Sequence, residues 1–188
     1  EVRAPAPPPP PIAEAIEASA QPQPLDSGLN DLRRMIVERI TANLDPNLEM
    51  QRTPRTLRIL SDRFFAVYQG AGLQLSEAEQ KTLFDMVVDE VVGFGPIEPL
   101  LRDPTVSEVM VNGPYLVYAE RQGKLFETEV RFDNDEHVMR VIERIVRPLG
   151  RRVDRKTPMV DARLPDGSRV NAIIPPAALD GPTITIRK

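Results

Sequence analysis

The chain of 188 residues has no cysteine, one histidine and a net charge of −4. This length allows one domain or two small ones, and the lack of cysteine excludes disulfide bonds and thiolate chemistry. A hydrophobic fraction of 41% is typical of a globular protein. The acidic charge argues against a molecule that binds nucleic acid over its whole surface. No apolar run approaches the roughly 20 residues that cross a bilayer, and no signal peptide is visible.

The first segment, residues 1–28, is rich in proline and alanine and has no sustained apolar periodicity. Such a segment buries too little apolar surface to offset the entropy lost on ordering. We therefore predict a disordered tail over 1–28. Because the chain starts at Glu1 and stops at Lys188 inside an alternating pattern, we also expect it to be a piece of a longer protein.

Helical periodicity dominates residues 29–92. The apolar stripes predict three helices, which run from Leu29 to about Asp45, from Pro54 to Gln69, and from the capping residue Ser76 to Gly93. The third start is marked by a capping box, in which Ser76 is followed three residues later by Glu79. Three amphipathic helices with short connections predict a small bundle.

The pattern changes to strands and turns over residues 93–188, after a compact linker rich in glycine and proline. We expect early strands over 108–111, 116–120 and 124–132. A helix should then begin at Asp133 or Asn134 and extend to about Arg147. The predicted fold class is therefore α+β, with a disordered tail, a three-helix bundle and an α/β unit that has a mostly antiparallel sheet.

The segment LPDGSRVNAII, residues 164–174, predicts a tight turn between two further strands, since Pro, Asp and Gly favour turns. Alternation places the apolar residues of this hairpin and of the last strand, TITIRK, on one face. The other face receives Arg163, Arg169 and Arg187. In one sheet, these guanidiniums could together hold the phosphates of a nucleotide. The alternative is a solvated face where Asp161 pairs with a neighbouring arginine, and the residues alone leave both open.

A second basic group surrounds Pro148–Gly150 and comprises Arg144, Arg147, Arg151, Arg152, Arg155 and Lys156. Phosphate contacts to nucleic acid often come from such clusters. The absence of interleaved aromatic residues for base stacking favours instead a protein–protein or inter-domain surface.

Few residues are suited to catalysis. His137 lies in the first turn of a charged helix without an evident partner, which favours a place on the surface. No segment matches the phosphate-binding loop GxxxxGK[ST], and we expect no metal site. The chain alone therefore lacks the parts of a catalyst.

Three stretches carry a resemblance to a known family: GFGPIEPLLRDPTVSEVMVNGP, RPLGRRVDRKTPMVDARLPDGSRVNAIIPP and GPTITIRK. They resemble the N-terminal region of the CpaF/TadA-type ATPases of tight-adherence (Tad) pili, a group within the type II/IV secretion ATPase superfamily. The resemblance is close over residues 90–188 and looser over 30–92. The order of the motifs makes it more specific than any one of them.

The resemblance implies a helical bundle, a PAS-like α/β N-domain and then a RecA-like motor domain whose Walker motifs this chain does not include. It further implies a cytoplasmic hexameric ring, placed at the inner membrane by pilus platform proteins, that uses ATP and Mg²⁺ to drive pilus assembly. In such proteins N-domain arginines reach nucleotide phosphates. The matching positions here are Arg169 and Arg187, and Arg163 matches more weakly. By itself the chain should show no ATPase activity.

Two other interpretations stay open. The α/β unit could be a regulatory domain that docks a membrane platform protein without touching nucleotide. It could also be part of a DNA-handling ATPase of the same superfamily, for which a salt-dependent shift of DNA by the isolated chain would be the sign.

Overall fold

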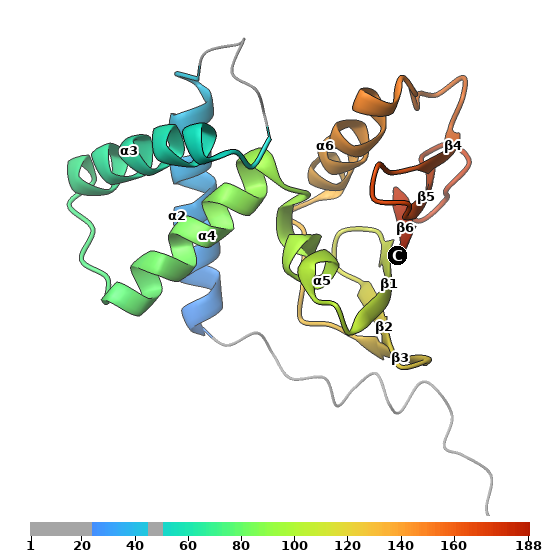
Figure 1. The fold of residues 1–188 in the computed structure, drawn as a ribbon, viewed down its shortest axis with the longest axis horizontal. Coiled ribbons are helices and arrows are strands. Elements are labelled where there is room, and N and C mark those ends of the chain that lie inside the picture. Colours follow the sequence, from blue (N-terminus) through green and yellow to red (C-terminus); the bar gives the residue numbers. More distant parts are fainter. Residues whose placement is uncertain (1–23, 45–50) are drawn as a thin grey trace, which may run out of the picture.

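The computed structural model describes residues 24–44 and 51–188 (Figure 1). Its first part contains the helices α2 (Pro24–Thr41), α3 (Pro54–Gly70) and α4 (Glu77–Val92). Helix α2 begins earlier than the expected Leu29, because a proline such as Pro24 is well tolerated in a first helical turn. The predicted disordered tail lies outside the described residues as far as residue 23.

The three helices form the expected bundle. Helix α4 starts at the predicted capping box, in which Glu79 N–H donates to the Ser76 hydroxyl and Ser76 N–H donates to the Glu79 carboxylate. The inward faces of the helices share one buried cluster, which includes Ile36, Leu60 and Val87. Apolar burial of this kind, worth about 25 cal/mol per Å², is the main stabilisation of a small bundle.

The second part is a six-stranded sheet reached through two short helices, η1 (Gly95–Ile97) and α5 (Glu98–Arg102). Its strands are β1 (Val106–Asn112), β2 (Val117–Arg121), β3 (Lys124–Glu127), β4 (Met159–Arg163), β5 (Arg169–Ile173) and β6 (Thr183–Arg187). They are ordered β3-β2-β1-β6-β5-β4, and every neighbouring pair is antiparallel. The predicted α+β class is confirmed.

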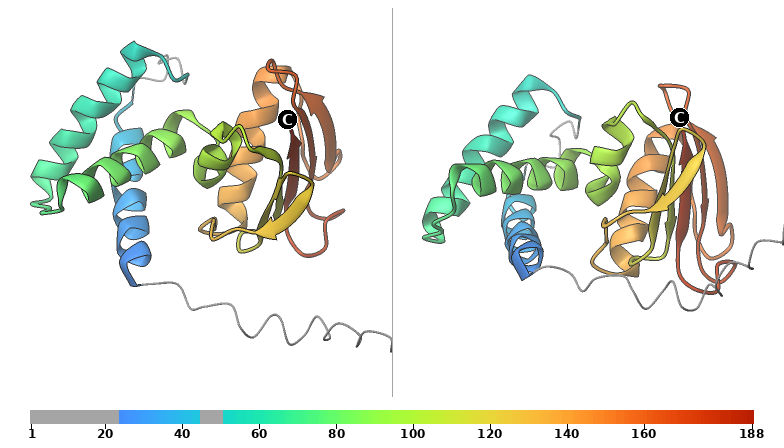
Figure 2. Two further views of the ribbon diagram at one scale, coloured as in Figure 1. Left: turned by 60° about the horizontal axis from the view of Figure 1, so that its bottom comes forward. Right: turned by 90° about the horizontal axis from the view of Figure 1, so that it is seen from below.

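One helix covers one face of this sheet. Figure 2 shows α6 (Asp135–Val146) and its extension η2 (Arg147–Leu149) against that face. Alternate strand residues such as Val109, Val170 and Ile186 pack there against Val141 of α6, in a core separate from that of the bundle. The opposite face is not covered by any of the described elements (Figure 2).

The clearest departure from expectation is β3, which ends at Glu127 instead of running to Phe132. Thr128 turns inward, where its hydroxyl and its N–H both donate to the carbonyl of Val117. Phe132 is buried in the core, and its N–H donates to the carbonyl of Pro114. The chain therefore leaves the sheet edge after four paired residues and crosses toward α6.

Candidate functional site

Three arginines from three strands lie side by side on the uncovered face of the sheet. The register pairs Arg163 of β4 with Arg169 of β5, and Arg169 with Arg187 of β6. All three are exposed. The structure therefore brings together the three residues that the alternation placed on one face, and we call them the arginine row.

The tight turn between β4 and β5 sets the register of the row. Leu164 N–H donates to the carbonyl of Ser168, Gly167 N–H donates back to Leu164, and Ser168 N–H donates to the Asp166 side chain. Gly167 has a φ of +94°, which suits glycine and few other residues. A one-residue slip would move every arginine to the core face, so the turn and the buried valines hold the row outside.

The arginine row has little internal charge compensation. Arg169 approaches Asp161 at 3.4 Å, and these side chains are 65% and 60% exposed. Within the described part of the chain, Arg163 and Arg187 make no side-chain hydrogen bond or ion pair. The same lateral line continues into Glu108 of β1 and Glu120 of β2, so that this line is basic at the β4 end and acidic at the β2 end.

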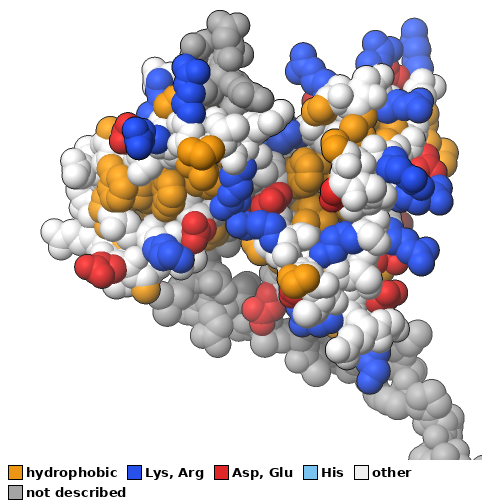
Figure 3. Space-filling view, viewed as in Figure 1, with side chains coloured by type: hydrophobic (Ala, Val, Ile, Leu, Met, Phe, Trp, Pro, Cys, Tyr) orange, Lys and Arg blue, Asp and Glu red, His pale blue; other side chains and the backbone are white. Residues whose placement is uncertain are grey.

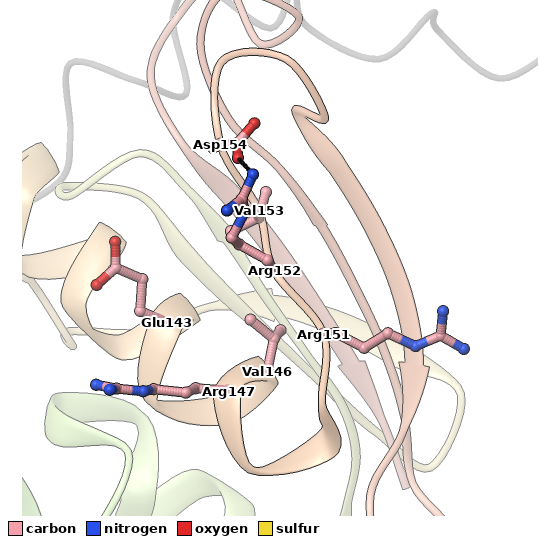
Figure 4. Close-up of a pocket in the computed structure, with 7 residues that line it drawn as sticks. All are labelled: Glu143, Val146, Arg147, Arg151, Arg152, Val153 and Asp154. Atoms are coloured by element: carbon pink, nitrogen blue, oxygen red, sulfur yellow. Dashed lines mark ion pairs between the residues drawn. The ribbon is translucent and has the colours of Figure 1, made fainter.

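The second basic group surrounds a hollow of about 530 Å³ at the end of α6 (Figure 4). Its basic lining is Arg147, Arg151 and Arg152, around apolar Val146 and Val153. Figure 4 shows Arg147 and Arg151 pointing in opposite directions, while Arg152 pairs with Asp154 at 2.7 Å.

The arginines of this second group therefore do not converge on one ligand. Arg155 is exposed in the loop beyond the hollow. Figure 3 shows that lysine and arginine side chains gather along the outer edge of the sheet unit, where they face solvent.

Arg144 is set apart from the rest of its predicted group. Its guanidinium turns toward the bundle and donates to the carbonyls of Glu90 and of Gly93, the latter at 2.7 Å. These are carbonyls that the end of α4 leaves without a helical partner. Arg144 therefore closes the end of α4 and joins the two parts of the chain.

The prediction that His137 lies on the surface is wrong, because its side chain is fully buried. Its Nε2 lies 3.0 Å from Oε1 of Glu90, and its Nδ1 lies 3.3 Å from Oδ2 of Asp133. The contact to Glu90 is an ion-pair contact without the alignment of a good hydrogen bond. An edge-on contact with Phe132 completes the enclosure, with ring centroids 5.0 Å apart.

Arg33 links the same two carboxylates from the other side. One of its Nη atoms donates to Oε2 of Glu90 at 2.8 Å and the other to Oδ1 of Asp133 at 2.6 Å. Its side chain is 6% exposed. We call these four residues, Arg33, Glu90, Asp133 and His137, the junction cluster, since they connect α2 and α4 of the bundle with the start of α6.

The charges of the junction cluster stabilise one another. Burial lowers the pKa of His137, but the close carboxylates of Asp133 and Glu90 favour the charged ring, outweigh burial and leave that pKa raised. Burial likewise opposes ionisation of Glu90, yet His137 and Arg33 bring its pKa below the ordinary value. The hydrogen bond from His137, followed by Arg33, lowers the pKa of Asp133 strongly. Both carboxylates are thus ionised and the imidazole is favoured as a cation.

Sequence reasoning missed the junction cluster because Arg33 and Glu90 come from helices that were interpreted as core stripes alone. One local signal was available. Asp133 precedes His137 by four residues at the start of a helix, a spacing that lets the two side chains meet. The distant partners could be found only from the packing of α2 and α4 against the sheet unit.

The described residues hold no group of three or more histidine, cysteine or acidic side chains that could bind a metal ion. None of the helices in this part of the chain combines the length and apolar character needed to span a bilayer.

Known protein families match both the helical bundle and the sheet unit of this chain. Residues 90–188 match the family described as type II/IV secretion system protein. The chain belongs to this family. Residues 29–92 match the family described as the N-terminal domain of type II secretion system protein E. The two matches meet where α4 ends and the glycine-containing connection begins.

Individual relatives each match about half of this chain. An uncharacterized protein of Methanocaldococcus jannaschii, MJ0781, is 44% identical over 102 residues, 52% of this chain and 14% of that protein. The type IV secretion system protein VirB11 of Brucella suis is 33% identical over 94 residues, 50% of this chain and 26% of that protein. The chain therefore spans a minor part of the length of these relatives.

A solved structure also matches. The crystal structure of the VirB11 ATPase from the Brucella suis type IV secretion system, in complex with sulphate, aligns with a TM-score of 0.46 and 32% identity. The alignment covers 50% of this chain and 29% of the solved chain.

Proposed function

We propose that this chain is the N-terminal region of a secretion ATPase of the Tad-pilus (CpaF/TadA) group, and that its arginine row contacts the phosphates of a nucleotide. The observation that carries the proposal is the register that places Arg163, Arg169 and Arg187 side by side on an uncovered sheet face. Membership of the secretion family and the similarity to VirB11, which is described as an ATPase, support it.

The chemistry of the arginine row suits a phosphate group. Arginines directly opposite one another in a sheet repel, and a bound anion relieves that repulsion. Each planar guanidinium can donate two parallel hydrogen bonds to phosphate oxygens. Asp161 is the one carboxylate in the described part of the chain that forms an ion pair with the row, and it is held loosely, at 3.4 Å from Arg169. A phosphate can displace so weak a surface pair at small cost.

We also propose which further domains and partners the longer protein has. A RecA-like motor domain would supply the Walker motifs and bind ATP and Mg²⁺. We further propose a hexameric ring in the cytoplasm, held at the inner membrane by pilus platform proteins. The exposed basic group around Arg147, Arg151 and Arg152 would face a neighbouring subunit or domain of that ring.

The proposal is tested in a protein that joins this region to its motor domain. Arg169→Ala and Arg187→Ala should each lower ATP turnover by roughly ten- to a thousandfold, because a guanidinium facing developing phosphate charge is lost. The free energy of unfolding should change by less than about 0.5 kcal/mol, since both side chains leave the exposed face. Lysine at either position should rescue poorly, because an ammonium cannot form the two-pronged contact.

The control is Arg152→Ala in a preassembled ring, which removes an exposed arginine away from the row and should leave turnover nearly unchanged. Equal losses from all three variants would indicate a defect in assembly. Unfolding of the Arg169 and Arg187 variants would show that the row supports the fold and does not sense nucleotide.

A docking role without nucleotide is the second candidate, and the acidic end of the same line of side chains favours it. Glu108 and Glu120 would repel phosphate but could meet a basic partner protein. Glu108→Gln and Glu120→Gln should then weaken binding of a platform protein, while Arg169→Ala leaves turnover unchanged. A DNA-handling role would instead require salt-dependent DNA binding by the chain.

A further inference from the structure

The junction between the bundle and the sheet unit is polar. Each unit has its own apolar core, and none of the described buried residues belongs to both clusters. Between α4 and η1 the chain has only Gly93 and Phe94. The centre of the view in Figure 3 shows basic and acidic side chains between the two parts. Polar side-chain contacts across the junction therefore help to fix how the two units are oriented.

The charged groups that face His137 come from every element packed around it. Helix α4 contributes Glu90, the segment before α6 contributes Asp133, and α2 contributes Arg33, which contacts both carboxylates. Arg34, also of α2, lies 3.8 Å from Asp133 and is 60% exposed. Arg144 of α6 is bound to the carbonyls at the end of α4.

The neutral and the protonated ring of His137 make different hydrogen bonds and charge contacts with these neighbours. In the neutral ring Nδ1 can accept the N–H of Asp133, at 3.2 Å, and only Nε2 then carries a proton toward a carboxylate. In the cation both nitrogens carry protons toward the carboxylates of Asp133 and Glu90. With a neutral ring, the buried carboxylate of Glu90 and the partly buried carboxylate of Asp133 lose the imidazolium charge between them, and Arg33 stays as the buried cation that contacts both. A carboxylate removed from water is costly when it loses part of its charge compensation, so this state weakens the contact between the units.

We propose that the junction cluster is a proton-operated latch, which holds the bundle against the sheet unit when His137 is protonated and loosens when the imidazole is neutral. The latch lies on the α6 side of the sheet, whereas the arginine row lies on the opposite face. The inference therefore goes beyond the proposed nucleotide contact and does not rest on it.

The experiment uses two features of the sequence, the single histidine and the absence of cysteine. The imidazole gives one resolved NMR signal whose shift reports its protonation. Gln69→Cys on α3 and Lys124→Cys on β3, both at exposed positions, provide two sites for spin labels. The distance distribution between the labels, measured by pulsed electron paramagnetic resonance, reports the orientation of the two units.

The latch predicts a narrow distance distribution at about pH 6 that broadens toward about pH 9. The midpoint of the broadening should coincide with the titration of the imidazole signal. In His137→Gln the distribution should be broad at both values and should not depend on pH in this range. Arg39→Gln is the matched control, since it removes an exposed arginine of the same helix that forms no ion pair within the described residues, and it should behave like the unaltered chain.

Two results would overturn the latch. One is a distribution that stays the same while the imidazole titrates, and the other is a pH response that persists in His137→Gln. The titration of the labelled chain with His137 in place needs no change in the cluster. The latch can therefore be tested by this titration even if His137→Gln folds poorly.

Discussion

Gly95 occupies a place where no other residue fits easily. Its φ is +62°, and a Cβ there would lie 3.2 Å from Cγ2 of Val141 and 3.4 Å from Nε2 of His137. The backbone of the connection thus approaches α6 as closely as the missing side chain permits. Gly93, two residues earlier, is crowded too, since a Cβ would lie 2.8 Å from the carbonyl oxygen of Asp89.

Gly95→Ala should therefore destabilise the chain in two ways. Alanine is strained at positive φ, and its methyl group presses on Val141 and His137, for a total of about 2–4 kcal/mol. Gly72→Ala separates the two causes, because Gly72 has a φ of +64° and nothing within 4 Å of a Cβ. It should cost about 1–2 kcal/mol. Urea denaturation measures both, and equal losses would mean that the connection relaxes away from α6.

At the scale of single residues, the sequence predicted correctly on which face a side chain lies wherever the alternation of a strand determines that face. Strand alternation placed Arg163, Arg169 and Arg187 on one face, and the register confirms it. Alternation says nothing about contacts between helices, however. His137 was wrongly expected at the surface because its partner Glu90 lies on a helix 47 positions earlier, whose approach is set only by tertiary packing.

At the scale of elements, α6 has two roles. One face covers the sheet with Val138, Val141 and Ile142, and another carries Arg144 to the end of α4. The sequence predicted the helix and its inward face from apolar spacing. The use of Arg144 was not predictable, since the arginine belongs by sequence to the basic group that follows it. The early end of β3 has a similar cause, because Thr128 satisfies its hydrogen bonds at Val117 instead of along the sheet edge.

Arg144→Met tests this connection between elements. The change keeps an unbranched apolar stem but leaves the carbonyls of Glu90 and Gly93 without their donor, which should cost about 1–3 kcal/mol. Arg140→Met, one turn earlier on the same helix and exposed, should stay within about 0.5 kcal/mol. Urea denaturation of the two variants gives the comparison. A loss no larger for Arg144 than for Arg140 would show that water replaces the guanidinium at the end of α4.

At the scale of the whole molecule, two small apolar cores are joined by buried charges, so overall stability depends on pH through the junction. Glu90 and Asp133 have a pKa below the ordinary 4.5 and 3.8 in the folded chain. Their contribution is therefore present above those ordinary values and is lost as the pH falls through the lowered ones. His137 has a pKa above the ordinary 6.5, so its contribution is complete below 6.5 and is lost as the pH rises through the raised value.

The free energy of unfolding should consequently be highest between about pH 5 and about pH 6.5 and should fall on both sides, by about 1.4 kcal/mol for each unit of net pKa shift. Urea denaturation across this range measures the profile. In His137→Gln the alkaline fall should disappear, because no group of the cluster then titrates near neutrality. The acid fall should shrink as well, since the hydrogen bond from His137 is the largest cause of the low pKa of Asp133. A profile of the unaltered chain that stays flat from about pH 6 to about pH 9 would mean that the imidazole does not lose a stabilising proton in this range.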